Sequence, residues 1–187
     1  MMEISQMKEK LMATLNPHRY EHTLGVSYTA VCLAMKYDVD LKKAEIAGLL
    51  HDSAKCIPDS EKIQLCEENS IEITEIEREQ PQLLHAKLGA FIAKRDYDIT
   101  NEEILSSIVK HTTGSENMTM LEKIIYVADY IEPGRDKAKH LKEIRKMAFT
   151  DIDAAIFMIM RDTIEYLKIS GSKIDKLTLV AYDYYKK

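Results

Sequence analysis

Residues 41–55 read LKKAEIAGLLHDSAK, and they join the helical pattern of this chain to a His-Asp pair. The apolar residues of the stretch recur at helical spacing and follow Asp40, a residue type that caps helices. They predict a helix that leads directly into His51 and Asp52. Neighbouring side chains on a regular helix point about 100° apart. His51 and Asp52 can therefore reach one ion only where the helix ends and the backbone turns.

The segments on both sides of this stretch have the same helical period. Upstream, Asn16 and Pro17 separate two predicted helices, because asparagine caps a helix and proline fits its first position. Downstream, Thr-x-x-Glu capping boxes at Thr100 and Thr119 predict two helix starts, and Thr150 is expected to cap a long apolar helix. A further helix is expected over residues 137–147. No stretch alternates strictly enough to predict a strand, so the expected fold is all-α.

Composition favours one globular domain over residues 1–187. The chain has 26 basic and 31 acidic residues, a formal charge of −5, and a hydrophobic share of 45%. No cluster of Lys and Arg predicts binding to nucleic acid, and the longest apolar run, seven residues, is far below the roughly 20 that span a membrane. The amino terminus lacks the apolar stretch of a secretory signal, which predicts a cytoplasmic protein.

A small set of polar side chains lies where helical patterns predict the interior. An aspartate in the apolar run of residues 124–131 is costly to bury unless it is paired or binds a metal. Taken singly, each of these residues is more often a satisfied core side chain than a ligand. Convergence on one metal site explains them all. The set comprises His22, His51, Asp52, His85, His111 and Asp129.

Imidazole and carboxylate ligands suit a first-row transition ion: iron, manganese, cobalt, nickel or zinc. Whether one ion or two is held stays open. Other polar residues are expected to be structural: His18 and His140 at the surface, Asp162 on the polar side of its helix, and Cys56 as a small buried side chain.

Four motifs resemble one known family. They are RYEHTLGV at 19–26, AGLLHDSAK at 47–55, KHTTG at 110–114 and YVADYIEPGR at 126–135. Their order and spacing resemble the HD-domain metal-dependent phosphohydrolases, and within them the bacterial YqeK subfamily. The resemblance covers nearly the whole chain. It implies a helical bundle of the HD-domain type and a symmetrical diadenosine tetraphosphate hydrolase that releases two ADP.

The resemblance also implies roles for individual residues. Iron would be held by His22, His51, Asp52 and Asp129, and would activate a water for attack on the central phosphoanhydride. Asp52 or Asp129 would orient that water or accept its proton, and a protonated His85 or His111 would be the best general acid, if one is needed. Substrate would contact Arg19, His22, Lys55, His85, His111, Thr112, Asp129, Arg135 and a nucleoside loop formed by Ser172, Lys173, Ile174, Asp175, Lys176 and Leu177.

The metal and nucleotide pocket is thus expected within residues 18–135, with residues 150–187 supplying the last helices and the nucleoside loop. Family members form homodimers, and the helix over residues 152–167 could be a contact face or part of the core. Three other functions are alternatives: an HD phosphohydrolase for another nucleotide, such as a mono- or triphosphate or an alarmone; a non-catalytic nucleotide sensor or assembly factor; and a plain helical interaction module.

Overall fold

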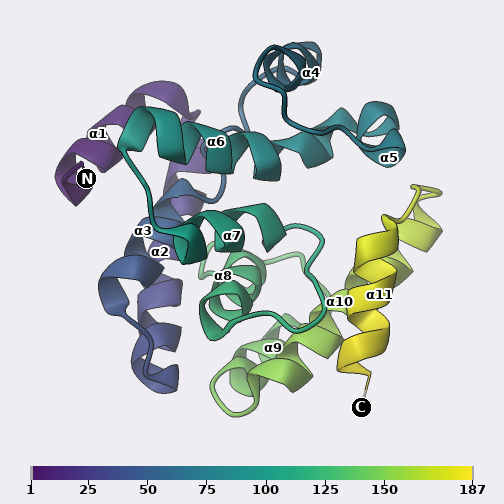
Figure 1. The fold of residues 1–187 in the computed structure, drawn as a ribbon. Helices are drawn as coiled ribbons and strands as arrows, with labels where there is room; N and C mark the ends of the chain where they lie inside the picture. Colours follow the sequence, from purple (N-terminus) through teal and green to yellow (C-terminus); the bar gives the residue numbers. More distant parts are fainter. Residues whose placement is uncertain (1, 187) are drawn as a thin grey trace.

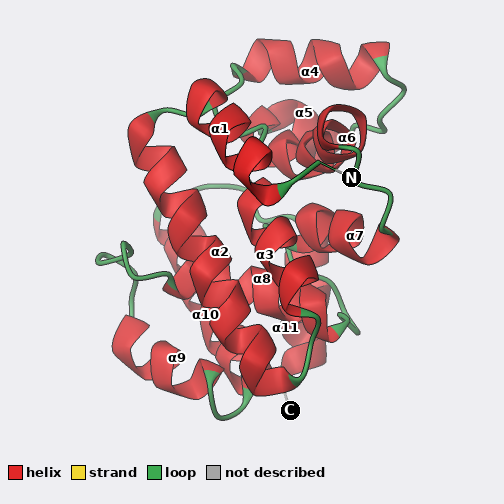
Figure 2. Cartoon of the chain, turned by 90° about the vertical axis from the view of Figure 1, so that its left-hand side faces the viewer, coloured by secondary structure: helices red, strands yellow, loops and turns green. Residues whose placement is uncertain are grey.

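The computed structural model describes residues 2–186, and within that range it contains helices and no strand (Figures 1 and 2). The all-α prediction is confirmed. Residues 1 and 187, the two ends of the predicted domain, lie outside the described residues. The helices run, in chain order, over Ile4–Thr14 (α1), Pro17–Tyr37 (α2), Leu41–Leu50 (α3), Asp59–Glu68 (α4), Glu75–Glu79 (α5), Pro81–Leu84 (η1, a 3-10 turn), His85–Tyr97 (α6), Glu102–Lys110 (α7), Met120–Ile131 (α8), Leu141–Ala148 (α9), Ile152–Ile169 (α10) and Lys176–Tyr185 (α11).

Three of the expected helix starts are confirmed. Asn16 caps α2 by accepting a hydrogen bond from the backbone N–H of Arg19 at 2.8 Å, and Asp40 caps α3. The capping box of Thr119 with Glu122 is also present at the start of α8. Each cap satisfies a backbone N–H that has no partner within its own helix.

Three helix starts differ from the prediction. Asn101, not Thr100, caps α7, and its side chain accepts from two backbone N–H groups. Asp151, not Thr150, caps α10. In both places two capping residues are adjacent, and the one nearer the helix is Asn or Asp, which cap better than Thr. The helix expected from residue 137 begins only at Leu141, because residues 137–140 form bends and turns.

Helix α8 passes through the middle of the molecule (Figure 1). It packs against α2, α3, α7, α9 and α10. A helix with neighbours on all sides must be apolar nearly all round, and α8 is buried from Ile124 to Ala128. Asp129 follows directly on this buried run, so the fold delivers a carboxylate to the point where α8 approaches α2 and α3.

A glycine sets the close approach of α2 and α3. A Cβ on Gly48 would lie 2.7 Å from the Cα of Ser27, so a larger residue would push the two helices apart. The approach brings the rings of His22 on α2 and His51, the residue after α3, to 5.5 Å between centroids. Gly48 therefore helps to place two of the predicted ligands beside each other.

The C-terminal helices complete the bundle. The apolar face of α10 packs on α8, α9 and α11, so this face of the helix over residues 152–167 belongs to the core. The loop before α11 reaches toward α5 (Figure 1), where Gln80 donates to the Lys173 carbonyl and Lys173 pairs with Glu79. Within residues 2–186 no helix is long and apolar enough to cross a membrane.

Candidate metal and phosphate centre

The His-Asp pair lies where the backbone leaves the helical path, as the sequence predicted. Helix α3 ends at Leu50, and the residues that follow form turns, with the backbone N–H of Lys55 donating to the carbonyl of Asp52. Both side chains consequently face the same point: His51 Nε2 lies 3.5 Å from Asp52 Oδ2. Both are almost fully buried.

Three histidines of the centre are oriented in the same way. The Nδ1 of each donates to the backbone carbonyl three residues earlier: His51 to Gly48 at 2.6 Å, His85 to Gln82 at 2.5 Å and His111 to Ile108 at 2.6 Å. Since a carbonyl only accepts, Nδ1 must carry the proton. With the proton on Nδ1, Nε2 is the ring atom that can offer a lone pair to the centre, which is the arrangement that metal ligands need.

His22 is oriented by a side chain instead. Its Nδ1 lies 3.0 Å from Oε1 of Glu132, a carboxylate that is only 3% exposed. The backbone N–H of Gly134 donates to the other oxygen of Glu132. A Cβ on Gly25 would lie 2.5 Å from that same oxygen, so glycine there leaves room for the carboxylate. Glu132 was not among the predicted site residues, although its place three residues after Asp129 was the available signal.

Carboxylates and imidazoles converge on one side of the centre. His22 Nε2 lies 3.0 Å from Asp129 Oδ1, and Asp52 Oδ2 lies 3.8 Å from the same nitrogen. Two groups of three have ligand atoms within 4.8 Å of one another: His22, His51 and Asp129, and His51, Asp52 and His111. His51 belongs to both.

The unsatisfied polar atoms show that these residues fit a cation. His22 Nε2, His51 Nε2 and Asp52 Oδ1 are buried and make no hydrogen bond. Leaving such atoms without a partner costs about 1–3 kcal/mol each. All three are electron-pair donors: the two imidazole nitrogens face Asp129 Oδ1, and Asp52 Oδ1 faces His85 and His111. Nitrogen and carboxylate oxygen together suit a divalent first-row transition ion.

The other side of the centre combines two imidazoles with two hydrogen-bond donors. Lys55 Nζ, His111 Nε2 and Thr112 Oγ1 each lie 3.1 Å from His85 Nε2. Asp52 Oδ1 faces this group, 3.3 Å from His85 and 3.6 Å from His111. Asp52 therefore turns one oxygen to each side of the centre.

Two arginines bring positive charge to the edge of the centre. Arg19 donates to Asp52 Oδ2 at 2.7 Å, and Arg135 donates to Asp129 Oδ1 at 2.8 Å. Arg135 also donates to the Asp129 carbonyl, which fixes its guanidinium over the end of α8. Together with Lys55 they surround the carboxylates of Asp52 and Asp129 with cations, a setting that attracts phosphate oxygens.

These neighbours shift the pKa values of the central groups. Although burial raises the pKa of Asp52, His51, His111 and Lys55 outweigh it and hold the pKa well below the usual range. Burial likewise raises the pKa of Asp129, and its contacts with His22 and His51 lower it further than burial raises it. Burial, Lys55 and His111 all lower the pKa of His85. A neutral His85 does not fit the expected protonated general acid.

The predicted nucleoside loop lies apart from the buried centre. Ser172 and Lys173 line a small cavity with Gln80 and Gln82, and the Gln82 carbonyl is the one that holds His85. Asp175 caps α11 through the backbone N–H of Leu177. Leu177 and Lys176 are exposed at the start of α11, and Ile174 is half-buried.

Other polar residues differ in part from the prediction. His18 is exposed, as expected. His140 is exposed too, but it pairs with Asp162, which is 4% exposed and was expected on a polar face. Cys56 was expected to be buried and is exposed, because the turns after His51 carry it outward.

Comparison with known proteins finds one matching family model and several similar proteins. The family model described as "HD domain" matches residues 19–134. A symmetrical bis(5′-nucleosyl)-tetraphosphatase from Bacillus subtilis is 39% identical over 91% of this chain and 90% of its own length. One of the same name from Staphylococcus aureus is 34% identical over 98% of this chain and 95% of its own length.

A solved structure is similar over the whole fold. It is a chain from Clostridium acetobutylicum described as a "predicted HD superfamily hydrolase involved in NAD metabolism". The TM-score is 0.95 at 40% sequence identity, and the match covers 99% of this chain and 97% of the other.

Proposed function

This chain belongs to the HD domain family, and we propose that it hydrolyses diadenosine tetraphosphate symmetrically, at the central phosphoanhydride, to give two ADP. Relatives named for that activity match about nine-tenths of the chain or more, and the resemblance to the YqeK subfamily is confirmed. In this proposal, the buried polar residues together bind a metal and a run of phosphates in one centre.

The observation that carries the proposal is the position of Asp52. One of its oxygens faces His22 and His51, and the other faces His85 and His111. A metal ion on the first side and a phosphate group on the second would therefore be neighbours. Metal-assisted hydrolysis of a phosphoanhydride requires that neighbourhood.

We assign the metal to His22, His51, Asp52 and Asp129. Iron is the proposed ion, with manganese, cobalt, nickel and zinc as alternatives. When bound, the ion supplies a Lewis acid that polarises a phosphoryl oxygen and lowers the pKa of water. Glu132 holds the His22 ring in the tautomer that directs Nε2 toward this site.

The remaining residues bind substrate and position the nucleophile. Asp52 and Asp129 are ionised at neutral pH and can orient a water molecule or accept its proton. The water oxygen bonds to one central phosphorus while the bridging P–O bond breaks, and its electron pair leaves with the second ADP. Cations offset the charge that develops on the phosphates. We assign this task to Lys55, Arg19 and Arg135, with Thr112 donating from the side of His85 and His111.

A product assay tests the proposal. The metal-loaded protein is incubated with diadenosine tetraphosphate, and the nucleotides are resolved by anion-exchange chromatography. We expect ADP as the sole product, and loss of both metal and turnover in His51→Ala. The matched control is His140→Ala, which removes a histidine outside the centre and should keep both.

The other products have definite meanings. ATP plus AMP would place the attack on an outer phosphorus and contradict the symmetrical cleavage. Absence of turnover by the metal-loaded protein would refute the proposed substrate and favour either another nucleotide substrate or a sensor function. A panel of mono- and triphosphates, together with an ADP-binding measurement, would distinguish these two. The metal count per chain decides the number of ions, since the lone pairs of His85 and His111 beside Asp52 Oδ1 also suit a second one.

A further inference from the structure

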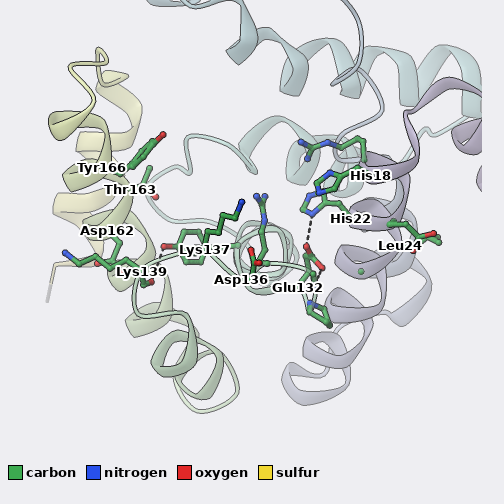
Figure 3. A pocket seen from close by; sticks show the side chains of 18 of the residues that line it. His18, His22, Leu24, Glu132, Asp136, Lys137, Lys139, Asp162, Thr163 and Tyr166 are labelled. Carbon is green, nitrogen blue, oxygen red and sulfur yellow. Dashed lines mark hydrogen bonds and ion pairs between the residues drawn. The ribbon is translucent and has the colours of Figure 1, made fainter.

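The centre lies between two cavities of unequal size. The larger, of about 1110 Å³, begins at Arg19, His22 and Arg135 and extends between α2, residues 132–139 and α10 (Figure 3). The smaller, of about 420 Å³, lies on the other side, between η1 and Ser172–Lys173. Gln82 lines the smaller cavity, and its carbonyl accepts from His85 of the centre.

A symmetrical substrate extends in two directions from the bond that is cut. This step rests on the proposed function. When the central phosphoanhydride lies over the centre, each half carries two phosphates and one nucleoside away from it. The loop at Ser172 and Lys173 can receive only one of them. The other nucleoside requires a separate site adjoining the metal side of the centre.

We propose that the larger cavity binds this second nucleoside diphosphate half. Its volume exceeds the roughly 300–1,000 Å³ of ordinary small-molecule sites, so a nucleoside fits. Figure 3 shows Thr163 and Tyr166 on α10 across the cavity from His18 and His22 on α2. Tyr166 is 69% exposed, which for a large aromatic side chain in a cavity indicates a surface on which a base can stack.

The cations of the cavity match the phosphates of such a half. Arg135 lies at the end next to Asp129, where a phosphate would leave the centre. Lys137 follows on the same loop and lines the cavity, and among the described residues it makes no ion pair or hydrogen bond. Its neighbour Lys139 differs, because it is paired with Glu165. Lys137 is therefore the side chain available for the outer phosphate of this half.

Product binding to the metal-loaded protein tests this site without turnover. Titration calorimetry with ADP should give two ADP per chain for the wild type. Lys137→Ala and Tyr166→Ala should each weaken one of the two sites by tenfold or more. Matched controls lie outside the cavity: Lys142→Ala on α9 and Tyr184→Ala on α11 should keep both sites. A wild type that binds one ADP per chain, or variants that weaken neither site, would overturn the proposal.

A substrate with one nucleoside gives an independent readout. Adenosine 5′-tetraphosphate has the same central bond but fills only one nucleoside site. We expect Tyr166→Ala to raise KM for diadenosine tetraphosphate about tenfold and to leave KM for adenosine tetraphosphate within twofold. Equal effects on both substrates would contradict the second site. Absence of turnover by the wild type would refute the proposed function instead, while the ADP count would still decide whether the cavity binds a nucleotide.

Discussion

Two buried aspartates in this molecule each lie beside a histidine and an arginine, yet their surroundings differ. Asp162 on α10 has both oxygens satisfied: His140 Nδ1 lies 2.9 Å from one, and Arg161 donates twice to the other. Asp52 has one oxygen bound by Arg19, while its Oδ1 makes no hydrogen bond. His51 beside it also keeps an unbonded Nε2.

The difference teaches that burial alone does not mark a functional carboxylate. Asp162 is a completed structural ion pair whose partners are half-exposed and shield it from solvent. Asp52 keeps one buried oxygen that has no hydrogen-bond partner. The Nε2 atoms of His22 and His51 beside it are also buried and have none. An incomplete buried group is stable only if something else completes it.

Neutralising each aspartate is the most direct test of the contrast between Asp52 and Asp162. Asp52→Asn removes the charge between the two sides of the centre, and we expect turnover of diadenosine tetraphosphate to fall by about 10³-fold or more, with loss of bound metal. Steady-state rates and elemental analysis measure both effects. If Asp52→Asn kept its metal and a tenth of the turnover, Asp52 would belong with Asp162 as a structural residue.

The Glu132→Gln substitution tests whether the orientation of the His22 ring contributes to metal affinity. The amide binds Nδ1 of His22 less strongly than the carboxylate does, so we expect metal affinity to fall by about 10–100-fold. Gly25→Ala should act in the same direction, because its Cβ would contact Glu132. Competition with a chelator measures the affinity. The exposed Glu143→Gln serves as a control, and an equal loss there would refute the role of Glu132.

Asp162→Asn should affect folding stability and not metal content. It replaces charge-assisted hydrogen bonds to His140 and Arg161 by weaker ones, which we expect to lower the free energy of unfolding by about 2 kcal/mol. Urea denaturation measures this change. Loss of metal from Asp162→Asn would remove the contrast with Asp52.

The smallest expected effect concerns Glu122, a buried carboxylate that is satisfied like Asp162. Burial raises its pKa, but hydrogen bonds from Lys110 and Ser106 lower it further than burial raises it. A depressed folded-state pKa stabilises the protein above the unfolded-state value, and this stability is lost as the pH falls through the folded-state value. We expect Glu122→Gln to cost about 1 kcal/mol at pH 7.

The pH series supplies the check on that mechanism. Because Gln does not titrate, the difference in unfolding free energy between wild type and Glu122→Gln should shrink from pH 7 to pH 3. A difference that stayed constant over this range would show that packing, and not charge, accounts for the cost.

Much of the fold could be predicted because its signals are local. Asn16, Asp40 and Thr119 cap helices through backbone groups three residues away, so a short stretch of sequence contains both partners. The wrong starts at Thr100 and Thr150 arose where a better capping residue came next. That preference of Asn and Asp over Thr is itself local, so these two starts were also within reach of the sequence.

The central residues were predictable for a different reason. A carboxylate in an apolar helix and histidines on apolar faces are costly unless they meet, so their convergence could be inferred without a structure. Glu132 and Asp162 could not be found in this way. Glu132 comes after the apolar run has ended and Asp162 stands next to Arg161, and only the folded chain shows that His22 and His140 approach them.

The hydrogen bonds that orient the histidines also set an order of assembly. His51, His85 and His111 take their orientation from carbonyls three residues away, so each ring is set as soon as its own turn forms. His22 and Glu132 are separated by 110 positions, and that ring is set only when this long loop closes. We therefore expect the centre to form in two steps during folding. A bound metal would then hold the N-terminal and C-terminal parts of the chain together.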